Sequence, residues 1–343
     1  SSIILMGFST LLIGILPTYE QIGVLAPLLL VLARIMQGIS AGGESPGGMI
    51  FALEHSPSNK KGFALSLVLA GTMSGTLLAT TISYIASLVP EMSWRIPFIL
   101  GFFVAFLGRY IRNKSDETSA YEQAKQNKQL VRYPILSGLK RYPKNILLIA
   151  IASSFSFCAF VVHCIYLPSY LKTTSLLPIS NETIDLSIIF VVIVSVVTAP
   201  VVGYMSDRIG KANIAKAITI MMSTFLFTMY VNLGYMSQNI FLLSQFIYAI
   251  LNGSLVASLT VFLIESISDT SVKYSSYSFA SGVGVILTGF SPMIATTFMS
   301  LENGGLLLGG FICLLGVLTI ASVYTLEGEV KVLKMGKPVY AKI

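Results

Sequence analysis

The amino-acid sequence predicts an all-α membrane protein that crosses the bilayer many times. Only 11% of its 343 residues are charged and 54% are hydrophobic, whereas an ordinary soluble domain carries roughly 25% charged residues. Residues 62–89 and 274–301 contain no charged residue at all, and about 20 mostly apolar residues are enough for a spanning helix. These observations exclude a soluble enzyme, a secreted disulfide-rich module and a disordered chain.

Ten apolar blocks have the length of a membrane span. Because backbone polar groups cannot stay unpaired in lipid, we expect each block to be a helix, and the alternating ten-residue segments of a β-barrel do not occur in the sequence. The blocks lie near residues 1–17, 26–52, 62–88, 94–112, 144–167, 184–205, 214–236, 239–265, 274–299 and 304–326.

The basic residues predict how the spans are oriented. All but three of the 22 Lys and Arg residues follow the second, fourth, sixth or eighth block or lie in the C-terminal tail; the exceptions are Arg34, Arg95 and Lys172. Loops rich in Lys and Arg face the cytoplasm, so we expect both chain ends there. This bias accounts for the net charge of +7, and we expect no nucleic-acid partner.

A polar segment divides the chain. Residues 113–143 are charged and long for a connection inside a compact domain. We therefore expect an incomplete N-terminal bundle of four spans over 1–112, a cytoplasmic linker over 113–143, a six-helix bundle over 144–326 and a cytoplasmic tail over 327–343. The apolar sequence starts by Ile3 without a basic region before it, so no signal peptide is predicted. Four spans plus six suggests six plus six with two helices missing.

The second block carries polar side chains at membrane depth. Arg34, Gln37 and Glu44 lie on one stripe of the expected helix, since about 100° per residue places the latter two within about 80° of Arg34. Intramembrane charges are costly and typically mark substrate or ion pathways. The alternative is a pair of buried salt bridges that fix helix packing. Glycines spaced by four, Gly38 with Gly42 and Gly43 with Gly47, predict close helix approach.

A second candidate site follows the sixth block. The turn contains Gly203, Asp207, Arg208, Gly210 and Lys211. An acidic residue at a helix end followed by basic residues can cross-link neighbouring helices at the inner mouth of a pathway, so these five residues are a candidate cytoplasmic gate. The alternative is a positively charged membrane anchor with a turn glycine.

Other chemistry is weakly supported. All three cysteines fall inside predicted spans, which predicts no disulfide framework. Cys158 and Cys164 point to different faces of one helix, so with His163 they do not form a metal site. His163 is interpreted as a packed or cavity-lining residue, with a proton relay as the alternative. Because nucleophile–base pairs, metal motifs and nucleotide loops do not occur, we expect no cofactor, no metal and no enzymatic activity.

Several of these motifs carry a family resemblance. The pattern Gly-x-x-x-Asp-Arg-x-Gly-Lys over 203–211 resembles the signature of the major facilitator superfamily. The glycine-rich run over 34–47, Lys60-Lys61-Gly62 and the run Trp94 to Phe98 resemble its metabolite:proton symporter branch. Residues 165–171 are most similar to the proline/betaine transporters within that branch.

The resemblance implies a fold and a mechanism. Two six-helix bundles would rock about a central site, with about ten of twelve spans present and the first two helices missing. The implied activity is proton-coupled symport of a small osmolyte such as proline or glycine betaine. Arg34, Gln37 and Glu44 would face the cavity, with Glu44 a candidate for proton coupling. Family analogy adds Phe157, Phe160, Tyr248 and Phe279 from cavity-lining helices, and Gln245 and Asn252 as polar candidates.

The implied partners are a small solute, a coupling proton and the lipid bilayer, and we expect a monomer in a bacterial inner membrane. Two alternatives stay open. One is symport of 2-oxoglutarate, citrate or shikimate, which are anions that would need more cations than the single intramembrane Arg34. The other is a truncated membrane remnant that does not transport.

Overall fold

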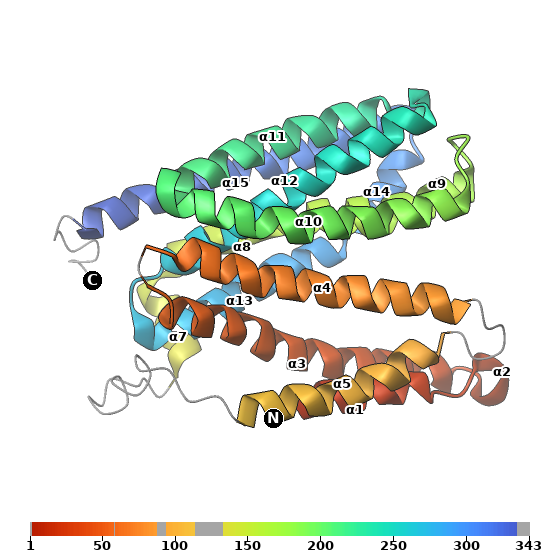
Figure 1. Ribbon diagram of the computed structural model, residues 1–343, viewed down its shortest axis with the longest axis horizontal. Coiled ribbons are helices and arrows are strands. Elements are labelled where there is room, and N and C mark those ends of the chain that lie inside the picture. Colours follow the sequence, from red (N-terminus) through yellow and green to blue (C-terminus); the bar gives the residue numbers. More distant parts are fainter. Residues whose placement is uncertain (1, 58, 88–93, 114–132, 335–343) are drawn as a thin grey trace.

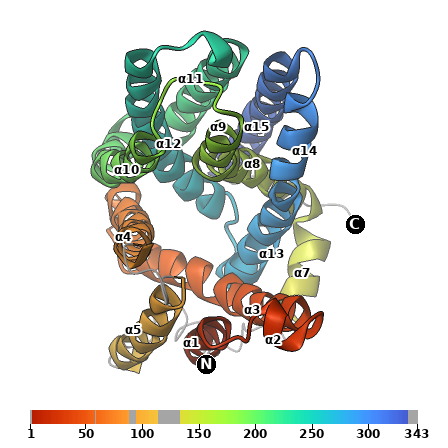
Figure 2. The same ribbon diagram turned by 90° about the vertical axis from the view of Figure 1, so that its right-hand side faces the viewer.

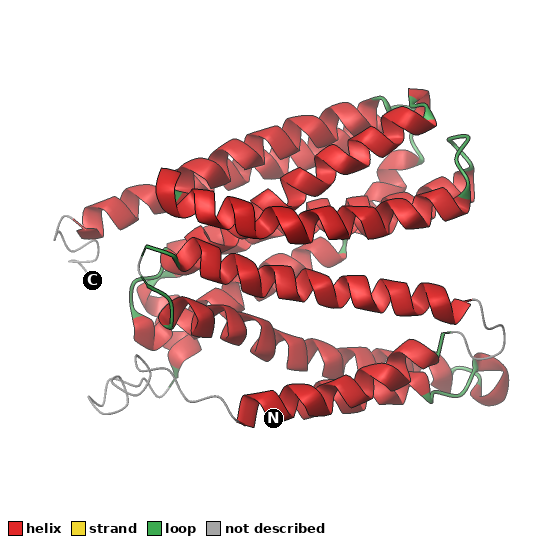
Figure 3. Ribbon diagram, viewed as in Figure 1, coloured by secondary structure: helices red, strands yellow, loops and turns green. Residues whose placement is uncertain are grey.

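The computed structural model describes residues 2–57, 59–87, 94–113 and 133–334. All regular elements among these residues are helices (Figure 3). Eight helical segments are long and apolar enough to cross a membrane, and two shorter apolar helices, α1 and α5, match the first and fourth predicted blocks. The elements that match the ten blocks are α1 (Ser2–Gly14), α3 (Leu25–Glu54), α4 (Lys61–Ser87), α5 (Ile96–Asn113), α8 (Pro143–Phe160) with η1 (Val161–Tyr166) and α9 (Leu167–Thr174), α10 (Asn181–Ile209), α11 (Lys211–Val231), α12 (Gln238–Glu265), α13 (Thr270–Gly289) with α14 (Ser291–Met299), and α15 (Gly304–Lys334).

The helices form two groups. In Figures 1 and 2, α1, α3, α4 and α5 lie on one side of the molecule, and α8, α10, α11, α12, α13 and α15 lie on the other. The groups meet where α4 packs on α10 and where α3 packs on α13. The start of α4, the end of α10, the short helix α7 (Pro134–Arg141) and the C-terminal end of α15 all lie at one end of the molecule (Figure 1).

Two breaks inside spans follow from proline. A proline ring clashes with the carbonyl four residues earlier, and Pro168 comes directly after the π-helical turn η1, where the span is wound more loosely. The second break separates α13 from α14 at Phe290, and Pro292 lies in the first turn of α14, where a backbone N–H would have no helical partner.

Two helical segments lie in regions for which the hydropathy pattern predicts no helix. The pattern predicts that the last span ends at residue 326, but α15 continues to Lys334. Glu327 and Glu329 accept ion pairs from Lys216 of α11 and Lys144 of α8, each at 2.8 Å, which hold the extended turns against the bundle. The second extension is α7, inside the expected linker, which starts with a proline in its first turn and ends with basic residues, as helix termini favour.

Helix α3 is less tightly packed than the helices of the larger bundle. A Cβ added to Gly38 or Gly42 would meet no atom within 4 Å among the described residues, so the close approach expected there is not observed. Leu28, Leu32 and Ile39 on the same helix are exposed. The larger bundle instead contains the densest core, in which Phe155, Met222, Tyr230, Phe241, Tyr248 and Leu255 are fully buried.

Candidate functional site

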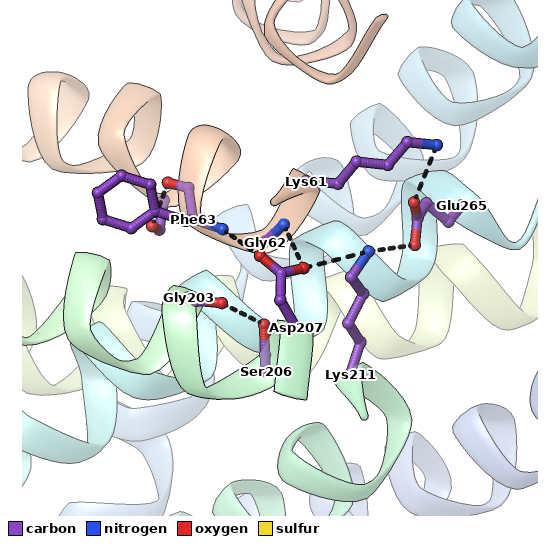
Figure 4. Close-up of polar contacts among 9 residues, drawn as sticks. Lys61, Gly62, Phe63, Gly203, Ser206, Asp207, Lys211 and Glu265 are labelled. Carbon is purple, nitrogen blue, oxygen red and sulfur yellow. Dashed lines mark hydrogen bonds and ion pairs between the residues drawn. The ribbon is translucent and has the colours of Figure 1, made fainter. Parts of the chain in front are cut away.

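The contact between the bundles is centred on Asp207. One carboxylate oxygen accepts the backbone N–H of Gly62 at 2.8 Å, and the other accepts that of Phe63 at 2.9 Å (Figure 4). Both amides lie in the first turn of α4, where backbone N–H groups have no partner inside the helix and where the helix dipole favours negative charge. Only 5% of the Asp207 side chain is exposed. A carboxylate of the larger bundle therefore caps a helix of the smaller one.

Two glycines allow this approach. A Cβ on Gly62 would lie 2.5 Å from Ser206 Oγ, 2.6 Å from the Gly203 carbonyl oxygen and 2.8 Å from Asp207 Oδ1. A Cβ on Gly203 would collide with Ser66 Oγ and lie 2.7 Å from the Gly62 carbonyl oxygen. Since the atoms in the way include backbone, side-chain rotation alone cannot make room. Helices α4 and α10 therefore pack backbone to backbone here, as small residues permit.

Charged side chains extend the contact to two further helices, α11 and α12. Lys211 Nζ, at the start of α11, lies 2.7 Å from Glu265 Oε2 at the end of α12 and 3.7 Å from Asp207 Oδ1. Lys61 of α4 reaches the other oxygen of Glu265 at 3.4 Å (Figure 4). Two lysines and two carboxylates thus alternate across the boundary, and the Lys61–Glu265 pair joins the two bundles directly.

The two remaining predicted gate residues have other roles. Arg208 is exposed, and its guanidinium carbon lies 4.4 Å from the centre of the Tyr204 ring in a cation–π contact. Gly210 has φ +110°, a backbone angle that suits glycine, and lets the chain reverse between α10 and α11. Of the five predicted residues, Gly203, Asp207 and Lys211 lie at the contact between the bundles.

Sequence reasoning missed four residues of this contact. It gave no gate role to Lys61, Gly62, Phe63 or Glu265. The sequence feature that could have indicated them is Lys60-Lys61-Gly62, a basic pair followed by a small residue at the start of a helix. Because Asp207 is 145 residues beyond Gly62, spacing alone could not pair them.

The polar stripe on α3 is partly assembled. Arg34 Nη1 donates to Gln37 Oε1 at 3.1 Å, and Gln37 Nε2 donates to the Thr10 hydroxyl of α1 at 2.9 Å. Among the described side chains, the guanidinium of Arg34 therefore pairs with an amide rather than a carboxylate, and it is exposed. Such a cation is available for an anionic group of a ligand. The side chain of the third member, Glu44, lies outside the described residues.

The aromatic and amide candidates divide by burial into exposed or half-buried rings and fully or nearly fully buried residues. Phe157 and Phe279 are 42% and 39% exposed, and Phe160 is half-buried. Tyr248 is fully buried and stacks on His163, and the Asn252 amide donates to Ser195 Oγ at 3.3 Å. Gln245 is also fully buried. These three residues of α12 are held by other helices of the larger bundle.

The fold and this site define a class of protein. The chain is a multi-pass α-helical membrane protein in which two helix bundles meet and are pinned at one end by a capped helix terminus and an ion-pair network. Residues 1–289 match the Major Facilitator Superfamily. The chain belongs to that superfamily.

Bacterial transporters are similar to most of the chain. A Staphylococcus aureus (strain COL) protein named for proline and betaine transport is 30% identical over 304 residues, which cover 86% of this chain and 65% of the relative. The glycine betaine/proline/ectoine/pipecolic acid transporter OusA of Dickeya dadantii is 31% identical, covering 86% and 61%. The proline/betaine transporter of Salmonella typhimurium is 29% identical with the same coverage. The chain thus spans less than two thirds of these relatives.

Solved structures support the same fold. The proton:xylose symporter XylE bound to 6-bromo-6-deoxy-D-glucose superposes with a TM-score of 0.71 at 18% identity, covering 95% of this chain and 79% of the symporter. Another structure, of a D-xylose-proton symporter, gives a TM-score of 0.64 at 17% identity with the same coverage. At such low identity, the similarity establishes the major facilitator fold alone.

Proposed function

We propose that this protein acts in secondary active transport, as a symporter that moves a proton together with a small osmolyte such as proline or glycine betaine. The observation that carries the proposal is the Asp207 cap on α4, which closes one end of the contact between two bundles. A pathway between rocking bundles needs a closure of this kind that forms and breaks. The names of the similar bacterial transporters support the solute class.

The gate works through electrostatics. The Asp207 carboxylate and the amides of α4 attract one another while the bundles touch, and Lys211 and Glu265 add charge pairs beside them. When the bundles separate, each of these groups becomes hydrated. The bonds lost are replaced by bonds to water, so the difference in free energy between the closed and open arrangements stays small enough to be overcome by solute and proton binding.

The solute site is proposed on α3 and its neighbours. A zwitterionic solute needs a cation for its carboxylate and aromatic faces for its ammonium group. Arg34 supplies an exposed guanidinium oriented by Gln37, and Phe157 and Phe279 supply exposed rings. Glu44 is proposed as the residue that carries the coupling proton, because the sequence places this carboxylate at membrane depth on the same stripe as Arg34 and Gln37.

The proposed location is the bacterial inner membrane, with the protein as a monomer and both chain ends in the cytoplasm. The basic residues that follow the even-numbered spans support this orientation. The gate, α7 and the C-terminal end of α15 lie at one end of the molecule (Figure 1), which then faces the cytoplasm. With this orientation, the proposed gate is closed toward the cytoplasm.

Uptake into proteoliposomes tests the proposal. We expect labelled proline and glycine betaine to accumulate under an inward proton gradient and to stop accumulating when the gradient is collapsed. Glu44→Gln is expected to abolish the effect of the gradient, whereas Glu182→Gln, a matched change at an exposed residue in the first turn of α10, leaves it intact. Uptake of 2-oxoglutarate, citrate or shikimate in place of proline and betaine would overturn the solute assignment.

A further inference from the structure

A buried polar cluster inside the larger bundle is not explained by the gate or by the proposed solute site. It is centred on His163, which lies in the π-helical turn η1 and is fully buried. Turns of this kind are rare and often occur at functional sites. The ionisable side chain sits in the middle of the longest candidate span, Pro143–Thr174, where such a residue suggests function.

Two residues of α12 hold the imidazole ring. Its Nε2 lies 3.0 Å from the Gln245 side-chain oxygen, and its face stacks on the Tyr248 ring with centroids 3.6 Å apart and planes at 19°. The Tyr248 hydroxyl in turn donates to the Ala159 carbonyl at 3.2 Å. Since an amide oxygen only accepts hydrogen bonds, Nε2 carries the proton, and Nδ1 of the neutral ring presents a lone pair.

Two atoms of the cluster are buried without a partner among the described residues. They are His163 Nδ1 and the Gln245 side-chain nitrogen. One is an acceptor and the other is a donor. Buried polar groups that lack a protein partner are usually satisfied by internal water, and lipid offers them none from the outside.

The surroundings of His163 carry no fixed charge in the contacts that the structure shows. The titratable group stacked on the ring is Tyr248 of α12, which interacts in turn with Cys164 of η1, Cys158 of α8 and Tyr230 of α11. A proton on the ring would be stabilised by water at Nδ1 and by the electron-rich face of the Tyr248 ring. Such a site binds a proton reversibly, because it lacks the carboxylate that would hold it firmly.

We propose that this cluster is a hydrated proton-binding site, in which water contacts His163 Nδ1 and the Gln245 amide, and His163 accepts a proton through that water. The existence of this site does not depend on the proposed function, but its role in transport rests on it. In proton-coupled transport, His163 would be a second protonatable residue of the coupling pathway, located in the larger bundle.

The chain suits a direct test because it contains two histidines, His55 and His163. In lipid nanodiscs, the ring nitrogens of ¹⁵N-histidine in the His55→Asn variant report on His163 alone. We expect cross-peaks with water and a titration of the ring with pH, because histidine is the side chain whose charge changes nearest to neutral pH. Ring nitrogens that neither exchange with water nor titrate would overturn the proposal. The His163→Gln variant, which keeps His55, supplies the signal of an exposed ring.

A second variant keeps the test independent of the fold. Gln245→Leu retains the histidine and removes the amide that orients it, so we expect the midpoint of the His163 titration to shift and both ring tautomers to become populated. A titration identical to that of the parent would show that Gln245 does not position the ring and would overturn the site as described.

The role of the site in transport is measured separately. In His163→Gln we expect gradient-driven uptake to fall about tenfold or more while solute exchange without a gradient continues. A parent that shows the titration but no gradient-driven uptake would refute the proposed symport and leave the proton site standing.

Discussion

Removing the Asp207 carboxylate is expected to open the contact between the bundles. Asp207→Ala deletes the acceptors for the Gly62 and Phe63 amides, which lie at 2.8 and 2.9 Å. A hydrogen bond to a charged group contributes about 1.5–3 kcal/mol, and charge at a helix N-terminus about 0.3–1 kcal/mol. Because the freed amides can hydrate, we take the lower values, which together are about 3 kcal/mol. The ratio of closed to open molecules should then fall about a hundredfold.

Two matched variants calibrate this result. Asp207→Asn keeps one oxygen but turns an amino group toward a backbone N–H, so we expect roughly half the effect, about a tenfold fall in the ratio. Arg208→Ala changes the neighbouring residue, which is exposed and contacts Tyr204 rather than α4. It is expected to leave the ratio unchanged.

Distances between spin labels measure the ratio. With the three native cysteines replaced by alanine, labels at Lys60 and Ile209, both exposed, report the separation between the start of α4 and the end of α10. The parent is expected to show mainly the short distance and Asp207→Ala a dominant long one, with Arg208→Ala like the parent. A distribution in Asp207→Ala that matches the parent would refute the idea that the cap holds this end closed.

Further predictions concern the same end of the molecule. Gly62→Ala should lengthen the α4–α10 distance in the same assay, because the added Cβ would collide with the backbone of α10. Gly71→Ala, on the same helix, places its Cβ in open space and should leave the distance unchanged. Equal distances in the two variants would contradict the steric argument. Burial alone would raise the pKa of Asp269, but hydrogen bonds from Ser271 and the ion pair with Arg141 at 2.7 Å outweigh it and hold the pKa below its ordinary value. A carboxylate with a depressed pKa stabilises the folded state at pH values above its ordinary pKa, near 3.9. This stabilisation is lost as the pH falls through the pKa of the folded state. The protection factors of the α7 amides, which correct for the pH dependence of intrinsic exchange, should therefore be constant from about pH 7 to about pH 5 and fall below about pH 4, and Asp269→Asn should remove that dependence. A change centred near neutral pH would contradict this assignment.

The sequence predicted the helices well because hydropathy acts locally. Each of the ten apolar blocks corresponds to a helical segment, since lipid requires the backbone to satisfy its own hydrogen bonds. The departures also have local causes. Pro168 accompanies a π-helical turn, and Glu327 and Glu329 extend α15 through ion pairs with lysines on two other helices.

The contact between the bundles could be predicted only in part. Asp207 and Lys211 were identified from charge at a helix end, but their partners Gly62 and Glu265 come from distant helices, and only packing brings them together. The role of Gly62 depends on a close backbone approach that hydropathy does not encode. Similarly, nothing in the spacing of His163 and Gln245 indicates that they form a hydrogen bond.

The proposed symport requires that solute and proton cross the membrane together. The most direct measurement is the pH outside lightly buffered vesicles that contain the protein, with no gradient imposed, when glycine betaine is added. Symport predicts that the external medium becomes more alkaline as protons enter with the solute, and that Glu44→Gln vesicles show no such change. Entry of labelled betaine without any change in external pH would contradict the account.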